Sequence, residues 1–163
     1  MQHMVDYLSP VGMIEITGTE DAICSIMFSE REEIEHRVQE NTPSVVQDCY
    51  HQLIEYFNGA RKVFTFPIWN AGTPFQKNVW SALTSISFGE TATYKEIAVA
   101  IGNEKSIRAV GNANGKNKLN IVVPCHRIIG SNGKLTGYGG GLWRKEWLLQ
   151  HENVLTNKEN NKN

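Results

Sequence analysis

IVVPCHR, residues 121–127, joins a run of β-branched residues to a proline, a cysteine and a histidine. Three β-branched residues in succession predict a short buried strand, and Pro124 cannot extend the ladder because it has no N–H to donate. We therefore expect the chain to turn at Cys125 and to hold its thiol rigidly. His126 can draw off the thiol proton, and the thiolate is the reactive form of cysteine. The stretch predicts a nucleophile beside a base; the alternative is a structural cysteine next to a surface histidine.

A glycine-rich loop and a helix follow this stretch. Six of the fourteen residues at 130–143 are glycine, too many for a helix or a packed strand, and Tyr138 lies among them. Such a loop either turns tightly or lets a flat ligand lie against the main chain. The next residues, WRKEWLLQHE at 143–152, predict a helix with Trp147, Leu148 and His151 on one side and Glu152 at its end.

Composition places the chain among ordinary globular proteins, with 163 residues of which 40% are hydrophobic and 20% charged. No apolar run approaches the roughly 18 residues that span a bilayer, and residues 1–4 lack the blocks of a signal peptide. We therefore expect a cytoplasmic protein that does not associate with membranes. The three cysteines, Cys24, Cys49 and Cys125, are not closely spaced, which indicates neither a disulfide framework nor a metal site. We expect no metal and no cofactor.

The net charge of −1 divides unevenly along the chain. Residues 1–70 hold four basic and eleven acidic side chains, a balance of −7, whereas residues 71–163 hold twelve basic and six acidic ones, a balance of +6. Such an asymmetry indicates two parts with different partners. The second part is suited to a phosphate backbone, unless the clustering is accidental.

The first part, residues 1–70, is expected to be a small α/β structural domain. Residues 11–16 and 23–28 alternate well enough for a hairpin, and residues 30–40 are polar enough for a solvated helix or a loop. From Val45, apolar residues recur every three or four positions, which predicts a helix ending at Asn58-Gly59. Cys24 and Cys49 fall on apolar faces and are expected in the core.

The second part, residues 71–155, is expected to be mainly helical. Thr73 and Pro74 are typical of a helix start, and Thr93 with Glu96 forms a capping-box pattern at the start of another. A short turn and a third helix at 106–114 complete a helix-turn-helix. The small residues Ala109 and Gly111 would let that helix approach another surface closely. Residues 156–163 are polar or charged and are expected to be disordered.

PCHR at residues 124–127, the loop around Tyr138 and the KEWLL helix together resemble the O6-alkylguanine-DNA alkyltransferase family, and the resemblance runs from about residue 73 to Glu152. It implies an α+β fold, with a small N-terminal α/β domain and a mainly helical C-terminal domain that contains a winged-helix-like helix-turn-helix. The implied function is DNA repair by irreversible transfer of an alkyl group from O6-alkylguanine, or from O4-alkylthymine, to Cys125. The implied partner is double-stranded DNA carrying O6-alkylguanine, and the protein is expected to act as a monomer.

The resemblance also assigns site residues. Cys125 matches the acceptor cysteine, His126 the base that relays its proton through water, and Glu152 the carboxylate that orients the histidine. Asn117 matches the hinge asparagine, and Tyr138 lies in the loop that closes over the guanine. The DNA-binding residues that it implies are Arg108, which replaces the extruded base, Tyr94, which crowds the nucleotide's phosphate, and the small residues Ala109 and Gly111.

Two departures from the family pattern and two other functions accompany this interpretation. Lys118-Leu119-Asn120 follow the hinge asparagine where many relatives have prolines, which predicts a looser connection, and Gly139 replaces a serine of some relatives. A thiol hydrolase would use the same Cys125 and His126 with turnover. A module that binds alkylated DNA without transfer would lack the acceptor cysteine.

Overall fold

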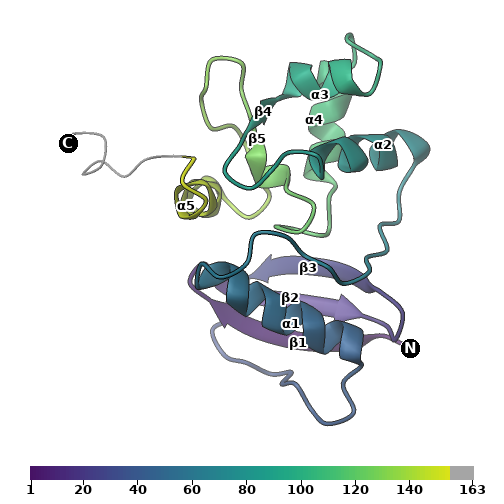
Figure 1. Cartoon of the computed structure of the whole chain (residues 1–163), viewed down its shortest axis with the longest axis vertical. Coiled ribbons are helices and arrows are strands. Elements are labelled where there is room, and N and C mark those ends of the chain that lie inside the picture. Colours follow the sequence, from purple (N-terminus) through teal and green to yellow (C-terminus); the bar gives the residue numbers. More distant parts are fainter. Residues whose placement is uncertain (155–163) are drawn as a thin grey trace, which may run out of the picture. The chain divides into compact units, whose positions relative to one another are not determined.

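A computed structural model describes residues 1–154 of the chain, so the expected disorder at 156–163 falls outside the described residues (Figure 1). The chain forms two units, one made of Met1–Ala71 with Lys118–Asn120 and the other of Gly72–Asn117 with the residues from Ile121 onward. The first combines an antiparallel sheet with one helix, and the second is mainly helical. The α+β prediction is confirmed.

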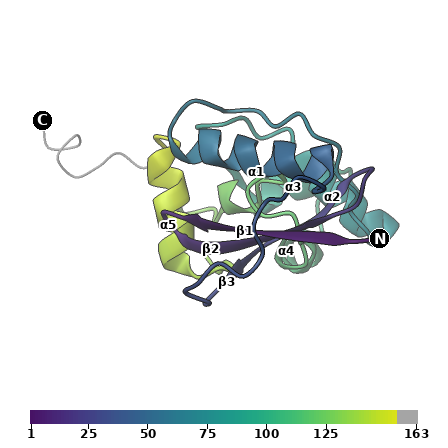
Figure 2. The ribbon, with the colours of Figure 1, turned by 90° about the horizontal axis from the view of Figure 1, so that it is seen from below.

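The first unit is a three-stranded antiparallel sheet, in the order β1-β2-β3, with helix α1 along one face (Figures 1 and 2). Its elements are β1 (His3–Ser9), β2 (Gly12–Gly18), β3 (Ile23–Ser29) and α1 (Ser44–Phe57). The predicted hairpin and helix are present, and residues 30–40 are a loop. Strand β1 was not predicted, because the buried carboxylate of Asp6 interrupts its apolar pattern.

Two other segments of the first unit line the edge of β3. Ile23 forms a parallel bridge with Ile68, and Ile26 forms one with Leu119, which is fully buried. The Ile26 amide donates to the Lys118 carbonyl at 2.8 Å, and the Asn120 amide donates to the Ile26 carbonyl at 3.2 Å. Hydrogen bonds therefore hold the connection at 118–120 on both sides of Leu119, and whether it is looser than in relatives with prolines stays a prediction. A proline at 120 could not make the second of these bonds.

The second unit contains the predicted helices α2 (Pro74–Leu83), α3 (Tyr94–Ala100) and α4 (Ile107–Gly115). Thr73 caps α2 and Thr93 caps α3, as the sequence predicts. Each cap is a complete capping box, which was predicted only for Thr93. Both helices pack against α4, and the indole of Trp80 donates to the Ala113 carbonyl at 2.8 Å. The sequence patterns therefore identified the helix-turn-helix and its caps.

The strand predicted at 121–123 is not formed. These residues make a turn in which Ile121 has a φ of 74°, a conformation that a β-branched residue rarely adopts. Ile121 and Val123 are nevertheless buried and Val122 is half-buried, because apolar content favours burial without specifying an extended backbone. Cys125–Arg127 then form the short 3₁₀ helix η1, and β5 (Ile128–Ile129) pairs in parallel with β4 (Ala92–Thr93).

Helix α5 (Leu142–His151) begins after Gly141, whose φ of 96° favours glycine. Trp147 and His151 share a side of the helix, as predicted, and their rings stack with centroids 5.0 Å apart. Both are half-buried, whereas Leu148 is fully buried. The buried side carries Arg144, Lys145, Leu148 and Leu149. Within residues 1–154, no helix is both long and apolar enough to cross a membrane.

Candidate active site at Cys125

Cys125 opens η1 and is 4% exposed. The side-chain amide of Asn117 donates to its Sγ at 3.2 Å and to the Val123 carbonyl at 2.9 Å. The Asn114 amide lies 3.5 Å from the Cys125 carbonyl. Two asparagines from the end of α4 therefore orient the thiol and its backbone, although the sequence interpretation named only Asn117.

His126, the next residue of η1, is fully buried beside the carboxylate of Glu152. Its Nε2 lies 2.7 Å from Glu152 Oε2, and its Nδ1 has no hydrogen-bond partner among the described residues. An ionised carboxylate can only accept, so Nε2 carries the proton and Nδ1 presents a lone pair. The arrangement leaves a base at Nδ1.

Arg127 holds the other side of the same carboxylate. Its Nε donates to Glu152 Oε1 at 2.8 Å, one terminal nitrogen donates to Oε2 at 3.1 Å, and the other donates to the Ile86 carbonyl at 2.7 Å. Burial alone would raise the pKa of Glu152, but the hydrogen bonds and charges of His126 and Arg127 outweigh it and hold that pKa well below its usual range. Glu152 is therefore ionised and fixed at the end of α5.

The two reactive groups are both shifted toward their neutral forms. Burial raises the pKa of the Cys125 thiol, although the Asn117 hydrogen bond, the charge of Lys145 and a hydrogen bond from Tyr138 offset part of that effect. Burial lowers the pKa of His126, offset in part by Glu152. A neutral thiol beside a neutral imidazole requires proton transfer before the sulfur can attack, and the imidazole can accept that proton.

Lys145 is a site residue that the sequence interpretation missed. The residue is fully buried on α5, and its Nζ donates to the Thr136 carbonyl at 3.2 Å. Burial lowers the pKa of Lys145 to about 8, while interaction with Cys125 opposes the shift. A signal was present in the sequence, because Lys145 precedes the apolar Leu148 and Leu149 by three and four positions and so shares their face.

The residues predicted to bind DNA lie on α3 and α4, which pack against each other. Arg108 and Ala109 are exposed in the first turn of α4, and Gly111 is half-buried one turn later. Tyr94 starts α3 and its ring lies over Gly111, since a Cβ there would be 3.6 Å from Tyr94 Cε1. Its hydroxyl is 2.6 Å from Thr136 Oγ1. The start of α4 therefore exposes the guanidinium of Arg108 beside the small Ala109.

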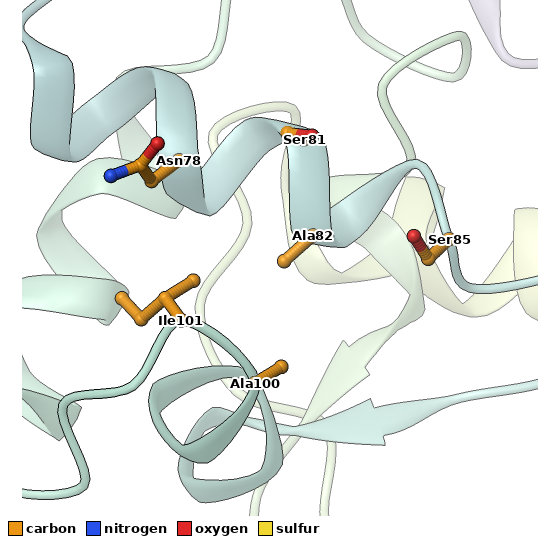
Figure 3. Close-up of a pocket in the computed structure, with 6 residues that line it drawn as sticks. All are labelled: Asn78, Ser81, Ala82, Ser85, Ala100 and Ile101. Atoms are coloured by element: carbon orange, nitrogen blue, oxygen red, sulfur yellow. The ribbon is translucent and has the colours of Figure 1, made fainter.

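A hollow of about 430 Å³ lies between the ends of α2 and α3 (Figure 3). Asn78, Ser81, Ala82 and Ser85 line it from the α2 side, and Ala100 and Ile101 from the end of α3. These side chains are uncharged and include none of the predicted site residues. The hollow offers neither a nucleophilic thiol nor an acid or base.

Two family models match the chain. Residues 74–154 match the DNA binding domain of 6-O-methylguanine DNA methyltransferase, and residues 6–69 match the ribonuclease-like domain of the same protein. The boundary between the two matches falls at residues 70–73.

Curated proteins and solved structures resemble the chain over most of its length. The constitutive methylated-DNA–protein-cysteine methyltransferase of Bacillus subtilis is 42% identical over 90% of this chain and 92% of its own. That of Methanosarcina acetivorans is 46% identical over 88% and 94%. The crystal structure of Mycobacterium tuberculosis O6-methylguanine methyltransferase matches with a TM-score of 0.83 and 37% identity over 100% of both chains. Mycobacterium tuberculosis OGT in complex with DNA matches with a TM-score of 0.80 and 41% identity over 93% and 91%.

Proposed function

The chain belongs to the 6-O-methylguanine DNA methyltransferase family, and we propose that Cys125 is the cysteine to which it transfers an alkyl group. Membership makes it a DNA-repair methyltransferase that moves alkyl groups from damaged DNA onto a cysteine of the protein. The substrate that we propose is O6-alkylguanine in double-stranded DNA. We also propose that the protein acts in the cytoplasm as a monomer, without a cofactor, a metal or a membrane.

The observation that supports Cys125 most strongly is the hydrogen-bonded set around it: Asn117 on the sulfur and a neutral His126 fixed by Glu152. Among residues 1–154, the other two cysteines have no such surroundings. Cys49 is a buried residue of α1 whose pKa burial raises, and the Cys24 thiol lies 4.0 Å from the Ala22 carbonyl. Of the three thiols, Cys125 is the one that lies beside a histidine base whose other ring nitrogen is hydrogen-bonded to a carboxylate.

The reaction proceeds by in-line displacement. The thiol proton passes through a water molecule to His126 Nδ1, and Glu152 stabilises the resulting imidazolium. Sγ then forms a bond to the alkyl carbon as the bond from that carbon to guanine O6 breaks. The electron pair remains on the guanine, whose ring takes up a proton for which Tyr138 is the donor. The thioether product cannot be hydrolysed by these residues, so each molecule reacts once.

Access to guanine O6 requires the nucleotide to leave the stack. Base extrusion costs a few kcal/mol and costs least at a damaged, weakly paired base. The exposed guanidinium of Arg108 fills the vacated space and bonds the orphaned cytosine, and Ala109 and Gly111 let α4 approach the groove. Tyr94 crowds the phosphate of the rotated nucleotide.

Replacement of the acceptor is the direct test. Cys125→Ser should abolish methyl transfer from O6-methylguanine DNA while leaving DNA affinity nearly unchanged, because the thiol makes few contacts with the backbone. Intact-mass measurement should show a gain of one methyl group in the parent and none in the variant. Cys49→Ser is the matched control and should still gain the methyl group. Transfer to Cys125→Ser would contradict the assignment, and repeated substrate consumption by the parent would indicate a thiol hydrolase.

Base extrusion has its own test at Arg108. Arg108→Ala should lower the saturated single-turnover rate on duplex DNA far more than the rate with free O6-benzylguanine, which needs no extrusion. Lys105→Ala, which removes a nearby charge preceding α4, is the control for phosphate binding and should weaken affinity and its salt dependence without changing the bound rate. Equal losses on duplex and free base would mean that Arg108 supports the fold instead.

A further inference from the structure

Thr136 uses three of its groups to join separate parts of the second unit. Its hydroxyl is 2.6 Å from the Tyr94 hydroxyl on α3, and its carbonyl accepts from Lys145 Nζ on α5 at 3.2 Å. Its methyl group lies against Gly130, where an added Cβ would come within 3.4 Å of it. One residue of the glycine-rich loop thus contacts a helix on the proposed DNA side, a helix on the thiol side and the start of its own loop.

The Tyr94 end of this connection reaches the proposed recognition helix. The tyrosine ring lies over Gly111 of α4, and an added Cβ there would be 3.6 Å and 3.7 Å from two of its carbons. Its hydroxyl is therefore fixed from two directions, by the packing on α4 and by the short hydrogen bond to Thr136. The Tyr94 side chain therefore links α4 to the loop that carries Thr136.

The Lys145 end of the connection reaches the thiol. The Lys145 ammonium is fully buried, and its charge favours the thiolate form of Cys125. That effect depends on distance, because Coulomb energy falls with separation and is larger where water is excluded. The carbonyl that accepts from Nζ belongs to Thr136, so the placement of the loop sets the placement of this charge.

We propose that Thr136 is a positioning residue for alkyl transfer, in which its hydroxyl bond to Tyr94 holds the loop so that its carbonyl keeps the Lys145 ammonium beside Cys125. The proposal rests on the proposed function of Cys125. Thr136 acts through Tyr94 and Lys145 and makes no contact with the alkyl group. Through the bond to Tyr94, the same residue also connects the recognition helix α4 to the surroundings of the Cys125 thiol.

Thr136→Val tests the proposal, because it removes the hydroxyl while keeping the shape and the carbonyl. Its single-turnover methyl-transfer rate at pH 7 should fall about fivefold to tenfold, the size expected for one hydrogen bond, with DNA affinity unchanged. The loss should shrink as pH rises, since a displaced ammonium leaves the thiol with a higher pKa. The same loss should appear with free O6-benzylguanine, which makes no DNA contact.

Three further variants separate positioning from plain stability. Thr136→Ser keeps the hydroxyl and should restore most of the rate. Tyr94→Phe removes the same hydrogen bond from the other side and should produce the same pH-dependent loss with free O6-benzylguanine. The double variant Thr136→Val/Tyr94→Phe should react with the free base no more slowly than the slower of the two single variants. Thr84→Val makes the same chemical change on an exposed threonine and should react at the parent rate.

Two results would overturn the proposal. A parent rate and pH profile in Thr136→Val would remove Thr136 from the reaction while leaving methyl transfer by the parent intact. A loss that is equal at every pH and tracks a lower melting temperature would make Thr136 a structural fastening of the loop. Failure of the parent itself to gain a methyl group would instead overturn the proposed function, and the positioning role with it.

Discussion

Each of the two units contains a fully buried carboxylate held by an arginine and a histidine. In the first unit, the Asp6 cluster consists of Asp6, Arg31 and His36, with Arg31 2.7 Å and His36 Nδ1 3.3 Å from the carboxylate. In the second unit, the Glu152 cluster consists of Glu152, Arg127 and His126. The pKa of each carboxylate is lowered, because hydrogen bonds and charges outweigh the effect of burial.

The clusters differ in the partners of the carboxylate and of the histidine outside the three residues. Asp6 Oδ2 accepts from the backbone amides of Glu35 and His36, both at 2.9 Å, so it fixes the loop at 30–40 onto β1. The His36 side chain is 43% exposed. In the Glu152 cluster the histidine is fully buried, and its second nitrogen has no partner among the described residues.

The difference separates a structural use from a chemical use of the same three residue types. A carboxylate whose acceptors serve backbone amides fastens a loop. A carboxylate that orients a buried imidazole with an available lone pair prepares a base. Residue composition alone does not distinguish the two clusters, whereas the partner of each histidine nitrogen does.

The largest expected difference between the clusters is in the rate of alkyl transfer. Glu152→Gln should slow single-turnover methyl transfer by about 10²- to 10⁴-fold, the range for losing general-base function, because the amide no longer stabilises the imidazolium. Asp6→Asn, the matched change in the other cluster, should leave the rate of the folded protein unchanged. Rapid-quench measurement of methylated protein provides both rates. Similar losses in the two variants would remove the functional distinction between the clusters.

The arginines should differ in their effect on stability. Arg127→Met should lower the free energy of unfolding by about 3–5 kcal/mol, since it leaves the buried Glu152 without its paired charge. Arg31→Met should cost less, because the Arg31 side chain is 28% exposed and Asp6 keeps its two backbone donors. Urea unfolding followed by circular dichroism measures both. A larger loss of unfolding free energy in Arg31→Met than in Arg127→Met would contradict this order of the two ion pairs.

The smallest expected effect is a pH dependence carried by His126. Burial lowers its pKa in the folded protein, so below about pH 6.5 the unfolded state binds more protons and stability falls as the pH decreases. This contribution to stability is present above about pH 6.5 and is lost as the pH falls toward the lower pKa of the folded state. Melting temperatures at pH 7, 6 and 5 should therefore fall more steeply in the parent than in His126→Phe. A parallel pair of curves would show that folding does not lower the pKa of His126.

Patterns that depend on neighbouring residues were predicted well. The caps at Thr73 and Thr93, the amphipathic helix α1 and the loop around Tyr138 follow from local hydrogen bonding, periodicity and glycine content. Patterns determined by distant contacts were not. Strand β1 was missed because the partners that allow Asp6 to be buried lie 25 to 30 residues away. The turn at Ile121 was predicted as a strand because a buried turn and a buried strand can both contain β-branched residues.

The resemblance predicts which residues form the site, and the structure shows how those residues are held. Nothing in the local sequence indicates that Arg127 completes the Glu152 cluster, since its partner is 25 residues away. Lys145 carried a local signal, because it is a cation on the same helix face as Leu148 and Leu149. The sequence interpretation missed this signal because it grouped Leu148 with Trp147 and His151 instead. The connections of Thr136 depend on a loop path that periodicity does not describe.

The segment Lys118–Asn120 has a consequence for synthesis on the ribosome. It covers part of the β3 edge of the first unit, yet it is translated after most of the helices of the second unit. Because the chain is synthesised from its N-terminus, this part of the β3 edge stays unpaired after the hairpin has formed. An unpaired strand edge is the kind of surface that pairs with other nascent chains. Leu119 closes this part of the edge only when translation has passed Asn120, five residues before Cys125 is added.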